Sequence, residues 1–333
     1  MTEGNMPRKV EISHRTIVFT VFFLIGLWLL FQIRQIILGL FVGVILMSAL
    51  NPIVDKMEKK YFPRVLATLL LYALILGGIS LIIASVIPPL VEQTSFLMSR
   101  IPLYVQKSGI LGIDPNLVIS QMPKLADIPA NILKLSLGVF SNIIGVLAIL
   151  VITFYLLLER KNLQQHLVVL FGEGQEKKAE DFINKAEKRL GDWVRGEAIL
   201  MSIIAMMTYV GLRFLGLEFA LPLALLAGAL EIVPTVGPSL AAFPAIIAGL
   251  TISPLMALAV AALYFLIQQI ENHLVVPQVM KKAVGVNPLV TIISLAIGFK
   301  LGGMIGAVLA VPVVLLLQVV ASEVFTSTRF QSL

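Results

Sequence analysis

The sequence predicts an all-α polytopic membrane protein with about six transmembrane helices and two re-entrant helical hairpins. Of its 333 residues, 58% are hydrophobic and only 13% are charged, and a mean hydropathy of +0.97 is incompatible with a soluble globular protein. The apolar residues are gathered into stretches long enough to cross a hydrocarbon layer of about 30 Å. Two late stretches are interrupted by proline or glycine, which predicts hairpins in place of single helices.

The first 158 residues are predicted to form a scaffold of four spans, at 17–33, 36–54, 65–90 and 135–158. The third span is expected to end at Pro88–Pro89, because proline removes a backbone donor and clashes with the preceding turn. Further prolines recur within 91–134. We expect short amphipathic helices there, on the external side of the membrane.

Residues 159–197 are predicted to form a cytoplasmic amphipathic connector. Apolar residues recur there at helical spacing beside lysine and arginine, which is typical of a helix lying in the membrane interface. The transport region is predicted to follow at 198–322, beginning with a fifth span at 198–212, and a cytoplasmic tail at 323–333 ends the chain.

The stretch 219–250 is predicted to be the first hairpin. As one helix it would be about 48 Å long, more than one crossing needs. Pro234, Gly237 and Pro238 interrupt it, so we expect one half-helix to end before them and a second to begin near Ser239, which would cap it. A hairpin whose tip is buried in protein, or faces a wet cavity, satisfies the backbone hydrogen bonds of two halves too short to span.

A sixth span at 255–276 and a second hairpin at 286–320 are predicted by the same reasoning. A fifth span with one hairpin and a sixth span with another form an inverted repeat, the pattern that marks a transporter's binding site near the membrane midplane. With both hairpins re-entrant and the N-terminus inside, 18 of the 25 lysines and arginines lie on the cytoplasmic side, as the positive-inside rule requires.

Glu231, just before the first interruption, is the leading candidate for a functional side chain. A carboxylate at membrane depth is costly unless it faces a cavity, carries a proton or pairs with a partner. It could couple proton or cation movement, or it could accept backbone hydrogen bonds at the hairpin tip. The residues of that tip, Pro234, Gly237, Pro238 and Ser239, could present freed backbone groups to a substrate or ion, or form only a tight buried turn.

Glu271 and Asn272, near the end of the sixth span, are the second pair of candidates. Glu271 shares an apolar helical stripe, so we expect it to have a partner, of which Gln268 is the nearest. Asn287 and Pro288 are a start signal for the second hairpin, with asparagine as the N-cap.

Lys300 and Gly303 complete the predicted substrate or ion site, because they lie at the second interruption. Lys300 could pair with Glu231 or Glu271, or extend to an aqueous vestibule.

Several classes of protein are excluded or disfavoured. The chain has no cysteine, which removes disulfides and thiolate chemistry. Its five aspartates all fall outside the predicted spans, and neither H-E-x-x-H nor G-x-S-x-G occurs, so intramembrane protease or hydrolase sites are not expected. We therefore predict no catalytic residues, no enzyme activity, no bound metal and no nucleic-acid partner.

The motifs resemble those of the autoinducer-2 exporter family. The residues 231–238 (EIVPTVGP) look like its E-x-x-P-x-x-G-P signature, and residues 270–273 (IENH) with 284–288 (VGVNP), 303–306 (GMIG) and 310–312 (AVP) are similar to its later motifs, in the same order. The resemblance covers nearly the whole chain.

The resemblance implies a multi-pass permease of the bacterial inner membrane, with membrane lipid around it and a homo-oligomer, a pentamer, as its assembly. It implies export of a small polar molecule such as autoinducer-2, with an ion or proton gradient as the energy source and an elevator-like movement. Both termini are expected in the cytoplasm. A Na⁺(Li⁺)/H⁺ antiporter and a non-transporting scaffold or channel stay open as alternatives, and no cofactor other than a coupling H⁺ or Na⁺ is expected.

Overall fold

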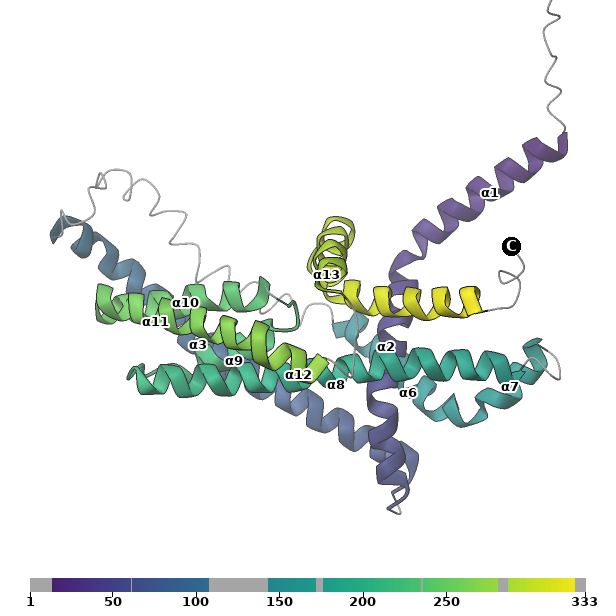
Figure 1. Ribbon diagram of the computed structural model, residues 1–333, viewed down its shortest axis with the longest axis horizontal. Helices are drawn as coiled ribbons and strands as arrows, with labels where there is room; N and C mark the ends of the chain where they lie inside the picture. The colour runs from purple at the N-terminus through teal and green to yellow at the C-terminus, as the bar shows by residue number, and fades with distance from the viewer. Residues whose placement is uncertain are drawn as a thin grey trace, which may run out of the picture.

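A computed structural model describes residues 14–60, 62–107, 143–171, 176–234, 236–280 and 287–326 (Figure 1). These residues form helices joined by short turns. Seven of the helices described are long and apolar enough to cross a membrane, which confirms the all-α polytopic fold. The elements in chain order are α1 (His14–Gln32), α2 (Arg34–Glu58), α3 (Arg64–Lys107), α6 (Ile143–Glu159), η2 (Arg160–Asn162), α7 (Leu163–Phe171), α8 (Glu176–Phe214), α9 (Ala220–Leu230), α10 (Val236–Ile252), α11 (Pro254–Ile270), the π-helix η3 (Glu271–Val275), α12 (Val276–Met280) and α13 (Pro288–Thr326).

The structure corrects the expected end of the third span. Helix α3 continues through Pro88 and Pro89 as far as Lys107. Two successive prolines remove only two hydrogen bonds from a 44-residue helix, and packing offsets that loss, because Val86 lies in the core that α3 forms with α9 and α10. Most of the predicted external region, residues 108–134, and the first part of the predicted fourth span lie outside the described residues.

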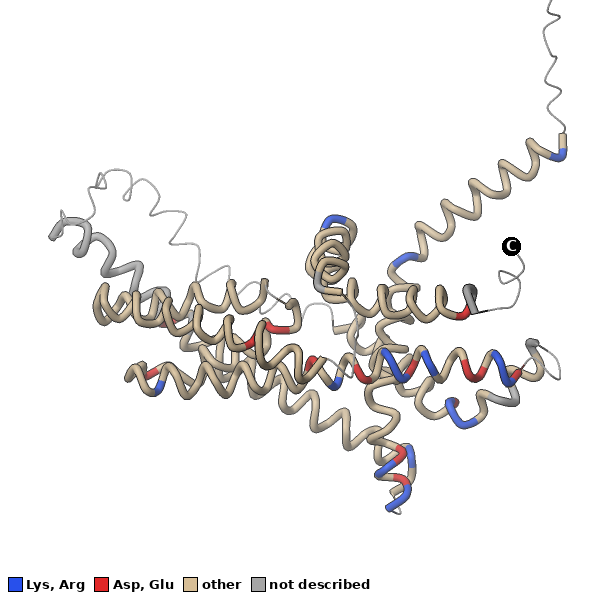
Figure 2. Tube along the Cα trace, viewed as in Figure 1, with Lys and Arg blue, Asp and Glu red and all other residues tan. Residues whose placement is uncertain are grey.

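The predicted connector and the fifth span are not separate elements. The first part of the connector forms η2 and α7, whereas its remainder from Glu176 continues into the fifth span as α8. Helix α8 is a single helix of 39 residues and therefore about 58 Å in length. Figure 2 shows charged residues along its N-terminal half and almost none on the neighbouring helices α9, α10 and α11. If the apolar half crosses a layer of about 30 Å, the charged half continues beyond it along the same axis and does not lie in the interface.

Helices α9 and α10 form the first helical hairpin, called hairpin 1 below. The Cβ that an alanine would add at Gly237 lies 1.8 Å from the Leu230 carbonyl oxygen, so only glycine permits this close return. Phe219 and Thr251, at the two outer ends, line one cavity of about 390 Å³. The chain therefore returns to the end of the molecule from which it started.

The second half of hairpin 1 begins earlier than expected. Helix α10 starts at Val236, which places Ser239 inside its first turn, so the prediction that Ser239 caps this helix is wrong. Pro238 is tolerated in the first turn because backbone N–H groups there have no partner within the helix.

Helix α13 forms a second helical hairpin, called hairpin 2. Gly302 and Gly303 depart from helical geometry, and Gly303 has a φ of +61°, which favours glycine. A Cβ added at Gly306 would lie 2.0 Å from the Gly298 carbonyl oxygen, so the two arms pack backbone against backbone. The side chain of Asn287 accepts a hydrogen bond of 2.9 Å from the Leu289 N–H, which confirms the predicted N-cap.

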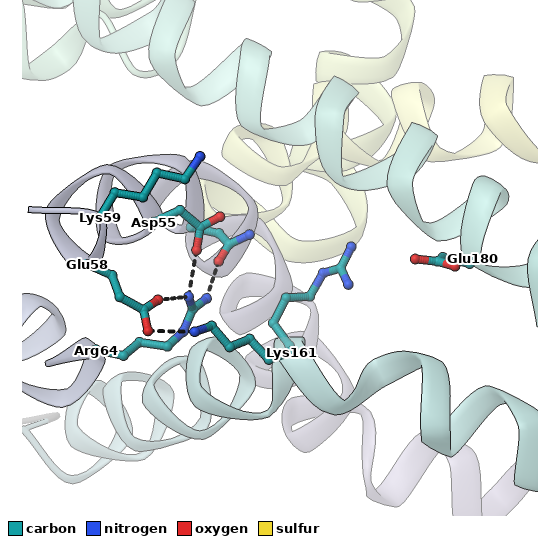
Figure 3. Close-up of a pocket in the computed structure, with 8 residues that line it drawn as sticks. Asp55, Glu58, Lys59, Arg64, Lys161 and Glu180 are labelled. Atoms are coloured by element: carbon teal, nitrogen blue, oxygen red, sulfur yellow. Dashed lines mark hydrogen bonds and ion pairs between the residues drawn. The ribbon is translucent and has the colours of Figure 1, made fainter.

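A buried arginine joins α2, α3 and α6 at one end of the molecule (Figure 3). The Arg64 Nε donates to the Leu157 carbonyl (2.8 Å), one of the orphan acceptors at the C-terminal end of α6. Its Nη1 lies 2.5 Å from Asp55 and 3.0 Å from Glu58, and its Nη2 donates to Asn51. Arg64 thus fixes the relative positions of three helices of the predicted scaffold.

Helix α8 meets α2 at a close contact. Pro52 has no N–H for the Ser48 carbonyl one turn earlier in α2. The Arg195 side chain of α8 donates to the Ser48 and Ala49 carbonyls (3.5 and 3.3 Å), and a Cβ at Gly191 would lie 2.4 Å from the Ser48 oxygen. Arginine and glycine together allow α8 to dock on the carbonyl that the proline leaves free.

Candidate coupling site

The two predicted glutamates come together in the structure. Glu231 follows α9 at the tip of hairpin 1, and Glu271 is the first residue of η3; their exposed fractions are 0% and 1%. Among the described residues, both oxygens of Glu231 and the Oε2 of Glu271 have no hydrogen-bond partner. The two carboxyl groups are close enough to interact electrostatically. Two unpaired carboxyl groups thus share one buried region.

A local change in helix type positions Glu271. The chain follows α-helical geometry to Ile270 and then forms the π-helix η3. Pro277, two residues beyond η3, cannot donate to the His273 carbonyl, which leaves the preceding turn free to widen. Single π-helical turns are frequent at functional sites in proteins.

A third glutamate, Glu197 of α8, belongs to the same site. It is 3% exposed, both of its oxygens lack a hydrogen-bond partner, and it interacts electrostatically with Glu231 and Glu271. Sequence reasoning missed it by placing it at the end of the charged connector. The available signal was its position immediately before the 15 uncharged residues 198–212.

The three glutamates Glu197, Glu231 and Glu271 are called the carboxyl cluster below. Buried polar groups without partners extend from this cluster along α11. Tyr264, Gln268 and Glu271 are spaced by four and three residues and so share one face. The Tyr264 hydroxyl and the Gln268 amide nitrogen have no hydrogen-bond partner. The Gln268 side chain lies beside the Glu271 carboxyl group, as predicted, but its nitrogen does not complete a hydrogen bond. Unsatisfied buried polar groups are few in native proteins, and each needs a functional or structural explanation.

No positive charge neutralises the cluster among the described residues. None of the ion pairs found there includes Glu197, Glu231 or Glu271. The same part of the chain contains no group of three acidic, histidine or cysteine residues arranged to hold a metal ion. In apolar surroundings the carboxyl groups therefore need protons or a loosely held cation to offset their charge.

The remaining predicted residues differ in their burial and in the hairpin to which they belong. At the tip of hairpin 1, Gly237 and Pro238 are buried and Pro234 is half-buried, close in the chain to Glu231. Ser239, Asn272, Asn287 and Lys300 are exposed. Pro288 and Gly303 serve hairpin 2, as its first helical residue and its reversal point. Lys300 makes no ion pair with any described residue, so the suggested pairing with Glu231 or Glu271 is not found.

The two hairpins nevertheless touch near the carboxyl cluster. Val233, at the tip of hairpin 1, packs in one apolar cluster with Leu295, Ala307 and Ala310 from both arms of hairpin 2. Two broken helical elements thus meet beside buried acidic groups in a bundle of membrane-crossing helices. This combination is characteristic of a membrane transporter.

The protein belongs to the AI-2E transporter family, whose family model matches residues 17–325. It is similar to YueF of Bacillus subtilis, with 30% identity over 292 residues that cover 81% of this chain and 79% of YueF. YrrI of the same organism is 25% identical over 320 residues, 91% of each chain. The AI-2 transport protein TqsA of Escherichia coli is 27% identical over 296 residues, 86% of this chain and 84% of TqsA.

Proposed function

We propose that the protein exports a small polar molecule of the autoinducer-2 type across the bacterial inner membrane and couples this export to proton movement. The main support is the buried pair Glu231 and Glu271. Among the described residues neither of them has a counter-charge, and both oxygens of Glu231 and the Oε2 of Glu271 have no hydrogen-bond partner. Two carboxylates that share one apolar site do not both carry charge. Gain or loss of a proton therefore changes the free energy of the site and can be linked to substrate release.

Protons fit this site better than a tightly held metal ion. A bound Na⁺ needs several oxygen atoms that converge on one point. The described part has no group of three acidic, histidine or cysteine residues arranged to hold a metal ion, so Na⁺ would need backbone or hydroxyl oxygens as further ligands. A proton needs only one carboxyl oxygen. Exchange of Na⁺ or Li⁺ for protons is measured in the same liposome experiment as the transport of autoinducer-2.

The proposed movement carries α8 to α13 past α2, α3 and α6, like an elevator. Its support is the location of both hairpins and of the three glutamates in α8 to α13. With both hairpins re-entrant, the N- and C-termini lie on the cytoplasmic side.

Transport by the purified protein in liposomes tests this proposal. Vesicles containing a pH-sensitive dye would be given autoinducer-2, related small polar metabolites, or Na⁺ and Li⁺, under an imposed pH gradient. We expect autoinducer-2 movement accompanied by proton movement. Proton movement with Na⁺ or Li⁺ alone would identify an antiporter, and no movement of any solute would contradict a transport role.

The variant Glu231→Gln tests the coupling site, because glutamine keeps the shape of the side chain and cannot exchange a proton. We expect loss of gradient-driven transport, with exchange of substrate across the membrane retained. The matched control is Glu159→Gln, which alters a carboxyl group that is 59% exposed and outside the site. Parental gradient-driven transport by Glu231→Gln between pH 6 and 8 would contradict the coupling role.

A further inference from the structure

We propose that Glu197 is the proton relay between the aqueous end of α8 and the buried pair Glu231 and Glu271. This inference rests on the proposed function, because it assigns the route by which the coupling protons reach that pair. It gives separate roles to the three carboxyl groups of the cluster. Glu231 and Glu271 hold the exchangeable charge, and Glu197 passes protons to and from them.

The first observation is the position of Glu197 along α8. Residues 176–196 carry many charged side chains, and residues 198–212 carry none. Glu197 is therefore the last ionisable group before the apolar half of the helix. It lies at the level where a proton must leave the polar end of the protein to reach the interior.

The second observation is that Glu197 forms no hydrogen bond or ion pair with any described residue that would explain its burial. Its exposed fraction is 3%, and neither carboxyl oxygen has a hydrogen-bond partner. Burying a carboxyl group without a partner is unfavourable, so stability alone would favour an apolar residue here. Such groups inside membrane proteins mark ion pathways and proton relays.

The third observation concerns the charged groups around Glu197. Helix α9, which leads to Glu231, packs against α8, and so do α11 and α12, which flank Glu271. Glu197 interacts electrostatically with both of these glutamates. On α8 itself, the nearest charged groups toward the solvent are Asp192 and Arg195, paired at 2.7 Å and about one-third exposed. Glu197 thus stands between a solvated ion pair and the buried carboxyl groups.

Among the described residues, the other elements that contact α8 form no ion pair with Glu197. Helix α7 also packs against α8, and its one titratable group, His166, lies beside Glu159. The contact with α2 is made by the Ser48 and Ala49 carbonyls, which occupy Arg195. Charged residues of α13 and η2 meet α8 only within its N-terminal half, where Glu323 pairs with Lys185 and Arg160 pairs with Glu187. Helix α12 (Val276–Met280) contains no charged residue. Within the part of the chain that the structure describes, Glu197 therefore has no counter-charge that would hold it permanently ionised.

The relay step is a simple exchange. Glu197 accepts a proton from water at the charged half of α8 and becomes a neutral carboxylic acid. The O–H bond of Glu197 then breaks, and a new O–H bond forms on the carboxylate of Glu271 or Glu231, directly or through one water molecule. Glu197 is left ionised and ready to accept the next proton.

The variants Glu197→Gln and Glu197→Asp in autoinducer-2-loaded liposomes test the relay. Without a pH gradient, the exchange of autoinducer-2 by each variant is measured and serves as that variant's own reference for folding and substrate binding. With a gradient, proton-coupled transport should be about 10²-fold slower, as is typical when a positioned proton-transfer group is lost. Glu197→Asp should restore part of the rate, and small weak acids such as formate or azide, which carry protons themselves, should speed up Glu197→Gln but not the parent.

The possible failures are distinguishable. If the parent shows no proton coupling, the proposed function and the relay are both wrong. If the parent is coupled and Glu231→Gln is uncoupled, but Glu197→Gln matches the parent, only the relay is wrong. If Glu197→Gln folds normally and also loses exchange, Glu197 contacts the substrate or holds the structure, and the relay is again overturned. Glu159→Gln serves as the carboxyl control in each measurement.

Discussion

At the scale of single residues, the protein contains a buried charged group that has hydrogen-bond partners and buried carboxyl groups whose oxygens mostly have none among the described residues. Arg64 is 8% exposed, and all three of its guanidinium nitrogens donate hydrogen bonds to acceptors of α2 and α6. Glu197, Glu231 and Glu271 are more buried than Arg64, and five of their six carboxyl oxygens have no hydrogen-bond partner among the described residues. This contrast separates structural from functional burial, because a charge that stabilises a fold must be paired, whereas a charge that changes during a cycle must be free to do so.

The tip of hairpin 1 should not tolerate any side chain at Gly237. In Gly237→Ala, the new methyl group would lie 1.8 Å from the Leu230 carbonyl oxygen, so the backbone must shift. We expect a loss of about 1–3 kcal/mol of stability, the usual effect of forcing extra volume into a packed site, together with reduced transport. Thermal unfolding in detergent measures the first effect. Gly78→Ala, a helical position with open space around it, is the control and should be at least as stable as the parent, because alanine favours a helix more than glycine does.

Arg64→Met should loosen the junction of α2, α3 and α6. The substitution leaves the Leu157 carbonyl and the Asp55 carboxylate without this donor, whereas Glu58 keeps Lys161. We expect a loss of about 3 kcal/mol, near the lower limit for breaking a buried ion pair, because Asp55 is 43% exposed and can still reach water. Chemical unfolding of the variant and of the parent would measure this loss of stability. The control Lys161→Met removes a partner of Glu58 that is 58% exposed and should cost less than about 1 kcal/mol; equal losses would contradict a special role for Arg64.

At the scale of elements, close backbone contacts made by glycine define both hairpins. Gly237 faces the Leu230 carbonyl in hairpin 1, and Gly298 and Gly306 face each other in hairpin 2. Backbones that approach so closely can turn back within a few residues, which a pair of helices with larger side chains could not do. The proline and glycine residues do more than interrupt the helices, since they determine how tightly each pair of arms closes.

Hairpin 1 is predicted to enter and leave the membrane on the same side. The exposed residues Glu218 and Ile252, at its two outer ends, can be replaced one at a time by cysteine on this cysteine-free background. A membrane-impermeant thiol reagent should label Glu218→Cys and Ile252→Cys from the same face of sealed vesicles. Labelling from opposite faces would show that the segment crosses the membrane, and the inverted-repeat interpretation would then be wrong.

At the scale of the whole molecule, α8 connects the predicted scaffold with the transport region. It packs against α2 on one side and against α9, α11 and α13 on the other. Its charged half pairs with both parts of the protein, through Arg160 with Glu187 and through Lys185 with Glu323. An elevator-like movement must therefore break or shift the contacts of α8 with α2 and η2, while those with α13 persist.

Cross-linking can distinguish the two sets of contacts. In the double variant Arg160→Cys/Glu187→Cys, a short bifunctional thiol reagent would tie η2 to α8, and we expect transport to stop. The matched pair Lys185→Cys/Glu323→Cys ties α8 to α13, which should move together, and we expect transport to continue. Unchanged transport with the first cross-link would argue for a fixed channel. Liposome transport before and after reduction of a cleavable reagent provides the measurement.

The sequence by itself determined the helical membrane fold, the two broken elements, and Glu231 and Glu271 as buried acidic groups. These features depend on local signals. A long apolar run crosses a membrane whatever its neighbours are, proline and glycine act on the few residues around them, and a carboxyl group inside an apolar run stands out from its immediate context.

Only the tertiary structure decided that Glu197 joins the other two glutamates, that α3 passes through Pro88–Pro89, and that α8 is one helix from Glu176 to Phe214. In each case contacts between distant segments outweigh the local signal. The packing of Val86 stabilises a helix that its prolines weaken, and the docking of α8 on α2 and α9 brings a residue at the end of a charged segment into the protein interior. The free energy of packing depends on which helix surfaces meet. The order of residues along one helix does not show which surface of another helix it will contact.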